Sequence, residues 1–395
     1  MKRREFLAAT GGVALSALSY RRVFGANDRL GVALIGSGRR GREVMKAFLA
    51  SGRAELRCIA DVYDVQRRRA REFLGVAAPE VVAYEEALAR PDVDAVLIGV
   101  PDHLHMSLAL AALAAGKHVY LEKPTTHAID EGARMVAAVR QSGKVCQTGT
   151  QQRSGAHYAK AKAEYFDKPA LGHVVFVRAT WSDFAWQRRK IAPQPRPAGL
   201  DWDRFIGPAK KVPYDWIRYD SWRYFPDYGG GLLADILTHW VDVAQWFLND
   251  PRPLNAVATG GIYQLKDGRE NPDTVSAILQ YAGGWNLQFE SSVLPVATPR
   301  PSVFFQGTEG SLDIARDGYV FRPNKGAPVE VTSTENLELA HVTSFLDAVR
   351  DAKRPSADIE VGVQACDPIH LARAAYWTRK RMRFDPSGTK IEVDG

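Results

Sequence analysis

Apolar and polar positions follow two different patterns along the chain, and the first pattern covers residues 29 to 149. Short apolar runs occupy 29–35, 55–60, 95–100, 118–121 and 145–148. Between them, apolar residues recur at helical spacing over 40–49, 103–115 and 128–142. Strands that alternate with helices predict an α/β domain over residues 27–150, with a doubly wound parallel sheet covered on both faces.

The pattern changes after residue 150, where strictly alternating segments replace the continuous apolar runs. A helix is predicted over 154–166 and a strand over 173–181, and at 285–290 every second side chain is apolar. One-sided strands in succession predict an antiparallel sheet with one face exposed to water. Further helical patterns lie near 336–352 and 362–379. We therefore expect a second, α+β domain over residues 151–395.

The segment 182–228 has no clear period and is crowded with aromatic residues. Structureless loops longer than about 15 residues are usually functional or disordered, and the aromatic content argues against disorder. The rings could pack on the C–H faces of a sugar, on the domain itself or on another subunit. Trp186 and Tyr228 are our candidates for substrate contact in this segment.

Charge and composition exclude two classes of partner. Residues 1–26 carry five basic residues and one acidic residue, which supply more than half of the net charge of +7. The small remainder gives no support to nucleic-acid binding. No stretch approaches the roughly 20 apolar residues that cross a bilayer. The three cysteines, Cys58, Cys146 and Cys366, lack paired spacing, so we expect them to be small core residues.

The N-terminus is typical of an export signal. The segment Lys2-Arg3-Arg4-Glu5-Phe6-Leu7, followed by a short run of small and apolar residues, resembles a twin-arginine signal. That pathway moves folded proteins, so we expect the protein to reach the periplasm or another extracytoplasmic compartment. No cysteine that could carry a lipid anchor lies nearby. The alternative is a basic N-terminal helix that stays attached to the domain.

The segment Gly36-Ser37-Gly38-Arg39-Arg40-Gly41 lies directly between the first predicted strand and the first predicted helix. This context is typical of a dinucleotide-binding loop, whose backbone faces the pyrophosphate. Asp61 follows the second strand, where a carboxylate accepts hydrogen bonds from ribose hydroxyls and repels a 2′-phosphate. NAD is therefore favoured, although Arg39 and Arg40 leave NADP open. The alternative is a glycine-rich turn without a ligand.

Two further clusters are candidates for chemistry. Lys123, in Glu122-Lys123-Pro124, follows a parallel strand at the sheet edge where such folds place ligands. Asp235 and His239 follow a run of three glycines, and their spacing places them on one helical face. A histidine can take the proton of a carbinol while hydride leaves for the nicotinamide, and a carboxylate can orient it. The alternatives are a surface lysine, a structural histidine, or a metal site completed by Asp242.

The chain after its N-terminal segment resembles the Gfo/Idh/MocA oxidoreductases. The resemblance rests on the glycine segment, on Pro101-Asp102-His103-Leu104-His105, on residues 116–124 and on residues 229–239. It implies a Rossmann domain followed by an open-faced sheet often used for oligomer contact, hence a homodimer or homotetramer. The chain departs from many members at Thr238, where they carry glycine before the histidine.

The resemblance also implies roles for individual residues. Lys123, Asp235 and His239 would form the catalytic group, with His239 as acid and base. The cofactor would contact the glycine segment, Asp61, Pro101, His105, Glu122 and Lys123. Gln151 and Arg153 would lie near the active cleft. No metal is expected.

We therefore expect an NAD-dependent oxidoreductase of a sugar or polyol. One alternative is a redox-neutral glycosidase that acts through a transient keto-sugar. Another is a sugar- or nucleotide-binding protein without activity, because fold alone does not settle function. Free cofactor should be scarce outside the cytoplasm, so we expect NAD(H) to be tightly held.

Overall fold

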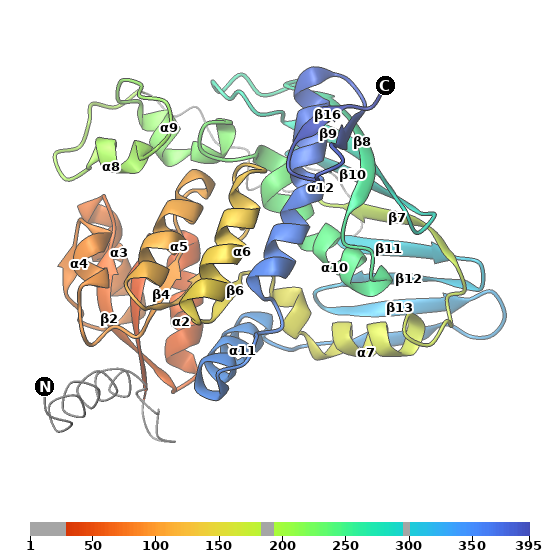
Figure 1. Cartoon of the computed structure of the whole chain (residues 1–395), viewed down its shortest axis with the longest axis horizontal. Coiled ribbons are helices and arrows are strands. Elements are labelled where there is room, and N and C mark those ends of the chain that lie inside the picture. Colours follow the sequence, from red (N-terminus) through yellow and green to blue (C-terminus); the bar gives the residue numbers. More distant parts are fainter. Residues whose placement is uncertain (1–28, 183–192, 295–300) are drawn as a thin grey trace, which may run out of the picture.

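The structure is a computed structural model that describes residues 29–182, 193–294 and 301–395 (Figure 1). Within these ranges the chain forms two sheets, one of six strands and one of ten. The predicted export signal and Trp186 lie outside the described residues. Among the described residues, no helix is long and apolar enough to span a membrane.

The first sheet is parallel throughout, in the order β3-β2-β1-β4-β5-β6. Its strands are β1 (Leu30–Ile35), β2 (Ala54–Ala60), β3 (Glu80–Val81), β4 (Ala95–Ile98), β5 (His118–Leu121) and β6 (Cys146–Thr148). All six residues of β1 are buried, as expected of a strand covered on both faces. The predicted parallel sheet is confirmed.

Helices cover both faces of this sheet (Figure 1). They are α2 (Arg39–Ala50), α3 (Asp64–Leu74), α4 (Tyr84–Leu88), α5 (His105–Ala114) and α6 (Glu131–Ser142). Side chains of α2 pack in one core under the sheet, and those of α4, α5 and α6 pack in another on the opposite face. All three cysteines are free and buried, which confirms their predicted place in the core.

The second sheet is mixed and mostly antiparallel, in the order β14-β13-β12-β11-β7-β10-β9-β8-β15-β16. Its strands are β7 (Val174–Thr180), β8 (Pro253–Gly261), β9 (Thr274–Tyr281), β10 (Asn286–Ser292), β11 (Ser302–Gly307), β12 (Gly310–Ala315), β13 (Gly318–Pro323), β14 (Val329–Thr332), β15 (Met382–Phe384) and β16 (Ile391–Val393). The predicted antiparallel sheet is confirmed, with one exception: β7 and β10 are parallel. The reason is that β7 lies between β10 and β11, which run in opposite directions.

Helices cover one face of the second sheet and leave the other exposed. The covering helices are α7 (Ala156–Tyr165), α10 (Thr238–Leu248) and α12 (Ile359–Thr378). On the other face, Val175, Val257 and Ile278 are 43%, 41% and 46% exposed. The predicted alternation between a packed face and a wet face is confirmed.

The last two helices tie the sheets together. In α11 (Leu337–Asp351), Phe345 packs edge-on against Phe48 of α2, with ring centroids 5.7 Å apart. Helix α12 contacts both α6 and β8. The chain therefore returns to the first sheet after completing the second, and Figure 1 shows α12 running between the two.

The aromatic segment packs onto the first domain. Its described part, 193–228, includes α8 (Trp202–Ile206) and α9 (Trp216–Asp220), which lie over the helices of the first sheet (Figure 1). Asp201 donates its backbone N–H to the carbonyl oxygen of Val62 at 2.9 Å. The buried aromatic core of the segment consists of Trp202, Phe205, Tyr224, Phe225 and Tyr228. For these five rings, the structure shows packing on the domain.

Candidate active site

Steric contacts explain the three glycines between β1 and α2. Gly36 has a φ of +84°, and a Cβ there would lie 2.7 Å from the carbonyl carbon of Gly99. A Cβ on Gly41 would lie 2.1 Å from the carbonyl oxygen of Gly36. A Cβ on Gly38 would meet no atom within 4 Å, because that position opens on the cleft. The outer glycines allow the tight turn, and Gly38 leaves the backbone accessible to a pyrophosphate.

Asp61 lies beside this loop, at the end of β2. Its carboxylate accepts hydrogen bonds from the backbone N–H of Ser37 at 2.7 Å, the Ser37 hydroxyl at 3.1 Å and the backbone N–H of Tyr63 at 2.9 Å. Burial raises the pKa of the Asp61 carboxyl, and these hydrogen bonds oppose the shift. The carboxylate is therefore fixed at the edge of the cleft, where a ribose contact was predicted.

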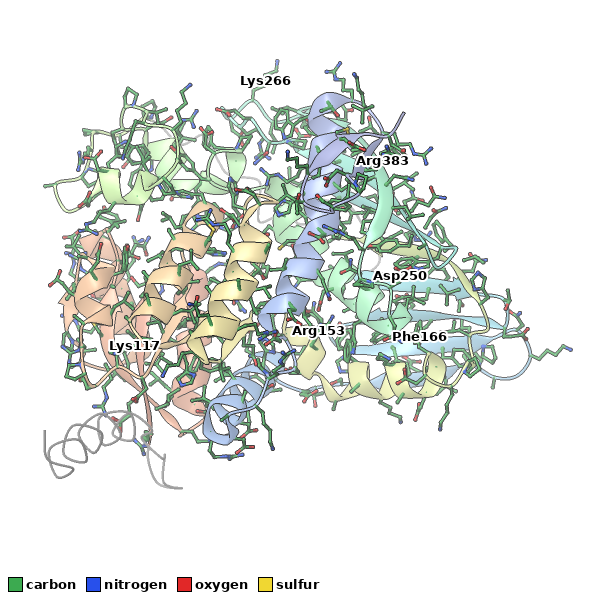
Figure 2. All side chains as sticks on the ribbon, viewed as in Figure 1. Lys117, Arg153, Phe166, Asp250, Lys266 and Arg383 are labelled. Carbon is green, nitrogen blue, oxygen red and sulfur yellow. The ribbon has the colours of Figure 1, made fainter. Side chains whose placement is uncertain are left out.

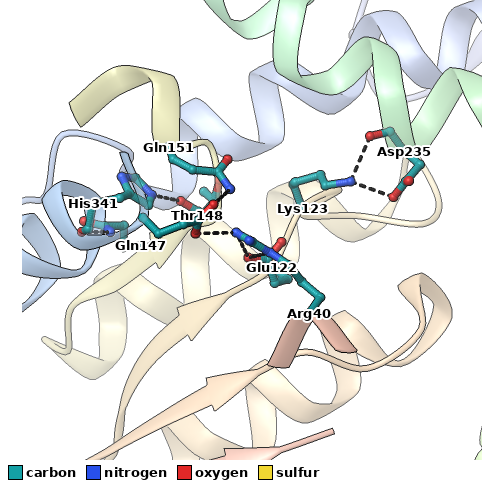
Figure 3. A network of polar contacts seen from close by, with 9 residues as sticks. Arg40, Glu122, Lys123, Gln147, Thr148, Gln151, Asp235 and His341 are labelled. Atoms are coloured by element: carbon teal, nitrogen blue, oxygen red, sulfur yellow. Dashed lines mark hydrogen bonds and ion pairs between the residues drawn. The ribbon is translucent and has the colours of Figure 1, made fainter. Parts of the chain in front are cut away.

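Arg40 is held by two carboxylates. Its Nε donates to Glu122 at 2.9 Å (Figure 3). Its Nη2 donates to Glu338 at 2.7 Å. Glu338 also accepts a hydrogen bond from the amide of Gln151 at 2.7 Å. The side chain of Arg39, by contrast, is 85% exposed. The expectation that Arg40 could bind a 2′-phosphate is corrected, because both carboxylates already compensate its charge.

Lys123 and Asp235 form an ion pair across the cleft. The Lys123 Nζ donates to a carboxylate oxygen of Asp235 at 2.6 Å and to its backbone carbonyl at 2.8 Å (Figure 3). The Arg223 Nε lies 3.3 Å from the same carboxylate oxygen. Burial alone would raise the pKa of Asp235, but Arg223 and Lys123 outweigh it and hold that pKa well below its usual range. The carboxylate therefore stays ionised.

The helical segment that carries Asp235 and His239 begins with a π-helical turn, η5 (Leu233–Leu237), and continues as α10. A π turn changes the angular spacing of side chains, so the α-helical rule behind the predicted pairing does not apply. The Asp235 carboxylate is held by Lys123 and Arg223 instead. The prediction that Asp235 orients the His239 imidazole is therefore corrected.

His239 is 4% exposed and lies at the cleft with an unsatisfied ring nitrogen. Its Nδ1 has no hydrogen-bond partner among the described residues. Its ring stacks on Trp181, with centroids 5.9 Å apart and planes 27° apart. Burial, and then the charges of Arg316 and Lys123, hold the pKa of His239 well below its usual range. The imidazole is therefore neutral.

These groups line one cleft of about 1060 Å³ between the two sheets. Its wall runs from the glycine loop and Asp61 to Lys123, Asp235 and His239. The cleft thus joins a dinucleotide-binding loop to a cation–carboxylate pair and a neutral imidazole. This arrangement suits the oxidation of a carbinol, in which a hydride leaves the carbon atom and a proton leaves its hydroxyl oxygen.

Comparison with known proteins identifies the family. Residues 30–150 match the model of the Gfo/Idh/MocA oxidoreductase family with an NAD-binding Rossmann fold, and residues 159–313 match a Gfo/Idh/MocA C-terminal domain. Over 369 residues the chain is 40% identical to dTDP-3,4-didehydro-2,6-dideoxy-alpha-D-glucose 3-reductase from Streptomyces violaceoruber, covering 85% of this chain and 91% of that protein. The chain belongs to the Gfo/Idh/MocA family.

Other members agree with this assignment. The chain is 28% identical over 295 residues to 1,5-anhydro-D-fructose reductase from Ensifer adhaerens, covering 72% of this chain and 77% of that protein. A levoglucosan dehydrogenase solved with NADH and levoglucosan has the same fold, with a TM-score of 0.71 at 20% identity over 90% of this chain and 99% of that one. This Gfo/Idh/MocA protein is therefore an NAD(P)-dependent oxidoreductase acting on CH–OH groups, and NAD is its cofactor.

Outside the glycine segment 36–41, three described residues that were expected at the site of this oxidoreductase do not line the cleft. The Arg153 guanidinium pairs with Asp242 at 2.8 Å, and Figure 2 places Arg153 at the junction of the two sheets. Tyr228 is fully buried against His103 in the aromatic segment. His105 contacts the carbonyl oxygens of Pro124 at 2.7 Å and of Val100 at 3.1 Å. Arg153 and Tyr228 are thus corrected to structural residues.

His105 holds together the loops that follow β4 and β5, next to the cofactor side of the cleft. Burial lowers its pKa to about 4, so the ring is neutral. Pro101, Glu122 and Gln151 do line the cleft, as expected of them. Asp242 is sealed against Arg153, and no group of metal-ligating side chains occurs among the described residues.

The structure adds cleft residues that the sequence did not single out: Trp181, Trp222, Arg223, Arg316 and Glu338. Trp222 and Arg223 belong to the aromatic segment, whose composition was the available signal. Trp181 follows β7, Arg316 lies in the hairpin between β12 and β13, and Glu338 begins α11. These three carry no local pattern, because only the tertiary fold brings them to the cleft.

Proposed function

We propose that this protein transfers hydride between a carbinol carbon of a sugar or polyol and NAD(H). Lys123, Asp235 and His239 are the proposed catalytic group. The observation that carries the proposal is their meeting in one cleft with the glycine loop and Asp61. Relatives named for reactions on sugars and inositols support the substrate class.

The charges in the cleft give Lys123 and His239 different roles: Lys123 donates a hydrogen bond to the reacting oxygen, and His239 accepts the proton. Asp235 keeps Lys123 in place as an ammonium donor, which can hydrogen-bond to the reacting oxygen and polarise it. His239 is neutral and accepts the carbinol proton, while NAD supplies the hydride acceptor when it is bound. Because Arg316, Lys123 and Arg40 disfavour an imidazolium, the proton must leave His239 again within the cycle.

We also propose that the protein is exported folded through its twin-arginine-like N-terminus and carries NAD(H) with it. The motif Lys2-Arg3-Arg4-Glu5-Phe6-Leu7 supports export. Mass spectrometry of nucleotide released on denaturing the purified protein tests the second part. Near-stoichiometric NAD(H) is the expected result, and an empty protein that must be supplied with cofactor contradicts it.

The test of the catalytic proposal is NADH formation on a panel of sugars and polyols. His239→Ala should lower turnover by about 10²–10⁴-fold, since it removes the proton acceptor. His173→Ala, which removes an exposed histidine outside the cleft, is the matched control. Unchanged turnover in His239→Ala would remove His239 from this role. Release of free sugar from glycosides without net NADH would favour the redox-neutral reaction instead.

A further inference from the structure

The hairpin between β12 and β13 brings one arginine to the reacting end of the cleft. The Arg316 side chain lines the cleft, and its guanidinium carbon lies 5.0 Å from the centre of the Trp181 ring. The same indole stacks on the His239 imidazole. Trp181 therefore contacts both Arg316 and His239 and fixes these two side chains relative to each other.

Among the residues that the structure describes, Arg316 differs from its neighbours in having no carboxylate as an ion-pair partner. Arg40 is paired with Glu122 and Glu338, and Arg223 is paired with Asp235. No carboxylate lies within 4.0 Å of the Arg316 guanidinium in the described ranges, although its side chain is exposed within the cleft. Burial lowers the pKa of Arg316 from its ordinary value, and the charges of Glu338 and Glu122 oppose this shift only in part.

Two other cleft arginines without a carboxylate partner in the described structure, Arg42 and Arg69, lie elsewhere. Arg42 donates to the carbonyl oxygen of Ser37 at 2.8 Å and to the amide of Gln66 at 2.9 Å, beside Asp61. These residues belong to the cofactor end. In the described cleft, Arg316 is thus the arginine beside Trp181 and His239 that has no ion-pair partner.

The Arg316 guanidinium, stacked on the Trp181 indole, favours one chemical class of ligand. Its planar fork matches a carboxylate with two parallel hydrogen bonds, and stacking on an indole keeps the fork oriented. A phosphate can accept the same two hydrogen bonds but carries a charge of about −1.5 to −2, so one arginine neutralises a carboxylate fully and a phosphate only in part. A carboxylate on the substrate is therefore the fitting partner.

Building on the proposed function, we propose that the substrate is an acidic sugar whose carboxylate pairs with Arg316 while one of its carbinols meets Lys123 and His239. The carbinol loses a hydride to NAD⁺ and a proton to the protein, which leaves a ketone and NADH. The carboxylate keeps its charge and takes no part in bond making. Arg316 is in this account a specificity-determining residue.

The test compares matched pairs of substrates, glucuronate with glucose and galacturonate with galactose, in kcat/KM measured by NADH formation. The wild type should prefer the acids. Arg316→Ala should lose about 10- to 100-fold in kcat/KM for the acids, mainly through KM, and leave the neutral sugars unchanged. Arg316→Lys should recover part of the preference. Arg322→Ala, at an exposed arginine on β13 outside the cleft, should behave as wild type.

A binding measurement separates this inference from the proposed function. Glucuronate should raise the unfolding temperature of the wild type and not that of Arg316→Ala. If no sugar is oxidised but this difference appears, the anion site stands and the proposed activity is wrong. If acids and neutral sugars behave alike in both proteins, the inference is wrong and the activity stands. Three other results would also overturn the inference. They are stronger binding of a sugar phosphate than of glucuronate, weaker NADH binding in Arg316→Ala than in the wild type, and a wild type that shows neither a glucuronate-induced shift of the unfolding temperature nor turnover.

Discussion

Two ion pairs on one helical segment show how differently the fold uses the same chemistry. Asp235 pairs with Lys123 at 2.6 Å, and Asp242 pairs with Arg153 at 2.8 Å. Both carboxylates come from the segment formed by η5 and α10, and both cations come from loops that follow strands of the first sheet. The first pair lines the cleft, whereas the second does not.

The difference lies in what surrounds each carboxylate. Asp235 has a second cation, Arg223, and its side chain keeps 15% exposure to the cleft. The side chain of Asp242 is 1% exposed, and its cation also packs on the ring of Trp246. An ion pair whose carboxylate has a second cation and remains partly exposed to the cleft can exchange contacts with a substrate. A sealed pair can only hold elements together, because separating it leaves a buried charge.

The largest expected effect is on turnover at the cleft pair. Lys123→Ala removes the donor to the reacting oxygen and should lower kcat by about 10²–10⁴-fold in NADH assays. Its unfolding free energy should change little, because Arg223 still compensates Asp235. A variant that loses stability as much as activity would show that the cleft pair is structural.

The sealed pair should respond in the opposite way. Arg153→Ala leaves the Asp242 carboxylate buried without its cation, so we expect a loss of about 3–5 kcal/mol in the free energy of unfolding. The measurement is chemical denaturation of the full chain. The folded fraction should keep kcat within a few-fold of wild type. A large loss of kcat with unchanged stability would place Arg153 in the chemistry after all.

The cleft pair has a titrating neighbour. Burial raises the pKa of Asp102 to about 7, with Arg223 opposing the shift. Between its ordinary range near 4 and pH 7, the folded protein holds a proton that the unfolded chain has lost, so this group's contribution to stability falls as pH rises through that window.

Asp102→Asn removes this titration. The variant should gain stability over wild type by up to about 4 kcal/mol above pH 7, and the difference should shrink towards pH 4. Unfolding temperature as a function of pH measures it. Asp203→Asn, at an exposed cleft residue, is the control. A difference that does not depend on pH would contradict the assigned titration.

The smallest effect is expected at the cofactor end. Asp61→Asn removes the charge that repels a 2′-phosphate and should shift the preference for NAD over NADP by about tenfold. Ratios of kcat/KM for the two cofactors measure it. Asp64→Asn, at a half-buried aspartate paired with Arg68 in α3, should leave the ratio unchanged. An unchanged ratio in Asp61→Asn would mean that Asp61 does not discriminate between the ribose hydroxyl of NAD and the 2′-phosphate of NADP.

The parts of the fold that could be predicted are those determined by residues close together in the sequence. The strand, the glycine loop and α2 follow each other directly, and Asp61 reaches Ser37 across two adjacent parallel strands. Continuous apolar runs and one-sided alternation likewise predicted both sheets. The parallel β7–β10 pair was missed because strand order within a sheet is not encoded in alternation.

The reacting end of the cleft could be predicted only in part. Lys123 and Asp235 were singled out from their local sequence context, and the family resemblance implied their roles. Their contact spans 112 residues and gives no local signal. Arg40 reaches Glu338 across 298 residues, and Arg316 depends on a hairpin turn. Arg153 and Tyr228 were wrongly predicted to lie at the cleft for the same reason. The sequence does not show which side of a helix or loop other elements of the fold will bury.

The most direct test of the account compares Asp235→Asn and Asp242→Asn in one experiment that measures kcat and unfolding free energy together. We predict that Asp235→Asn loses kcat by at least about tenfold while its stability stays close to wild type. Asp242→Asn should keep kcat in its folded fraction and lose stability. If both variants lose activity and stability in the same proportion, the division between a chemical pair and a structural pair is wrong.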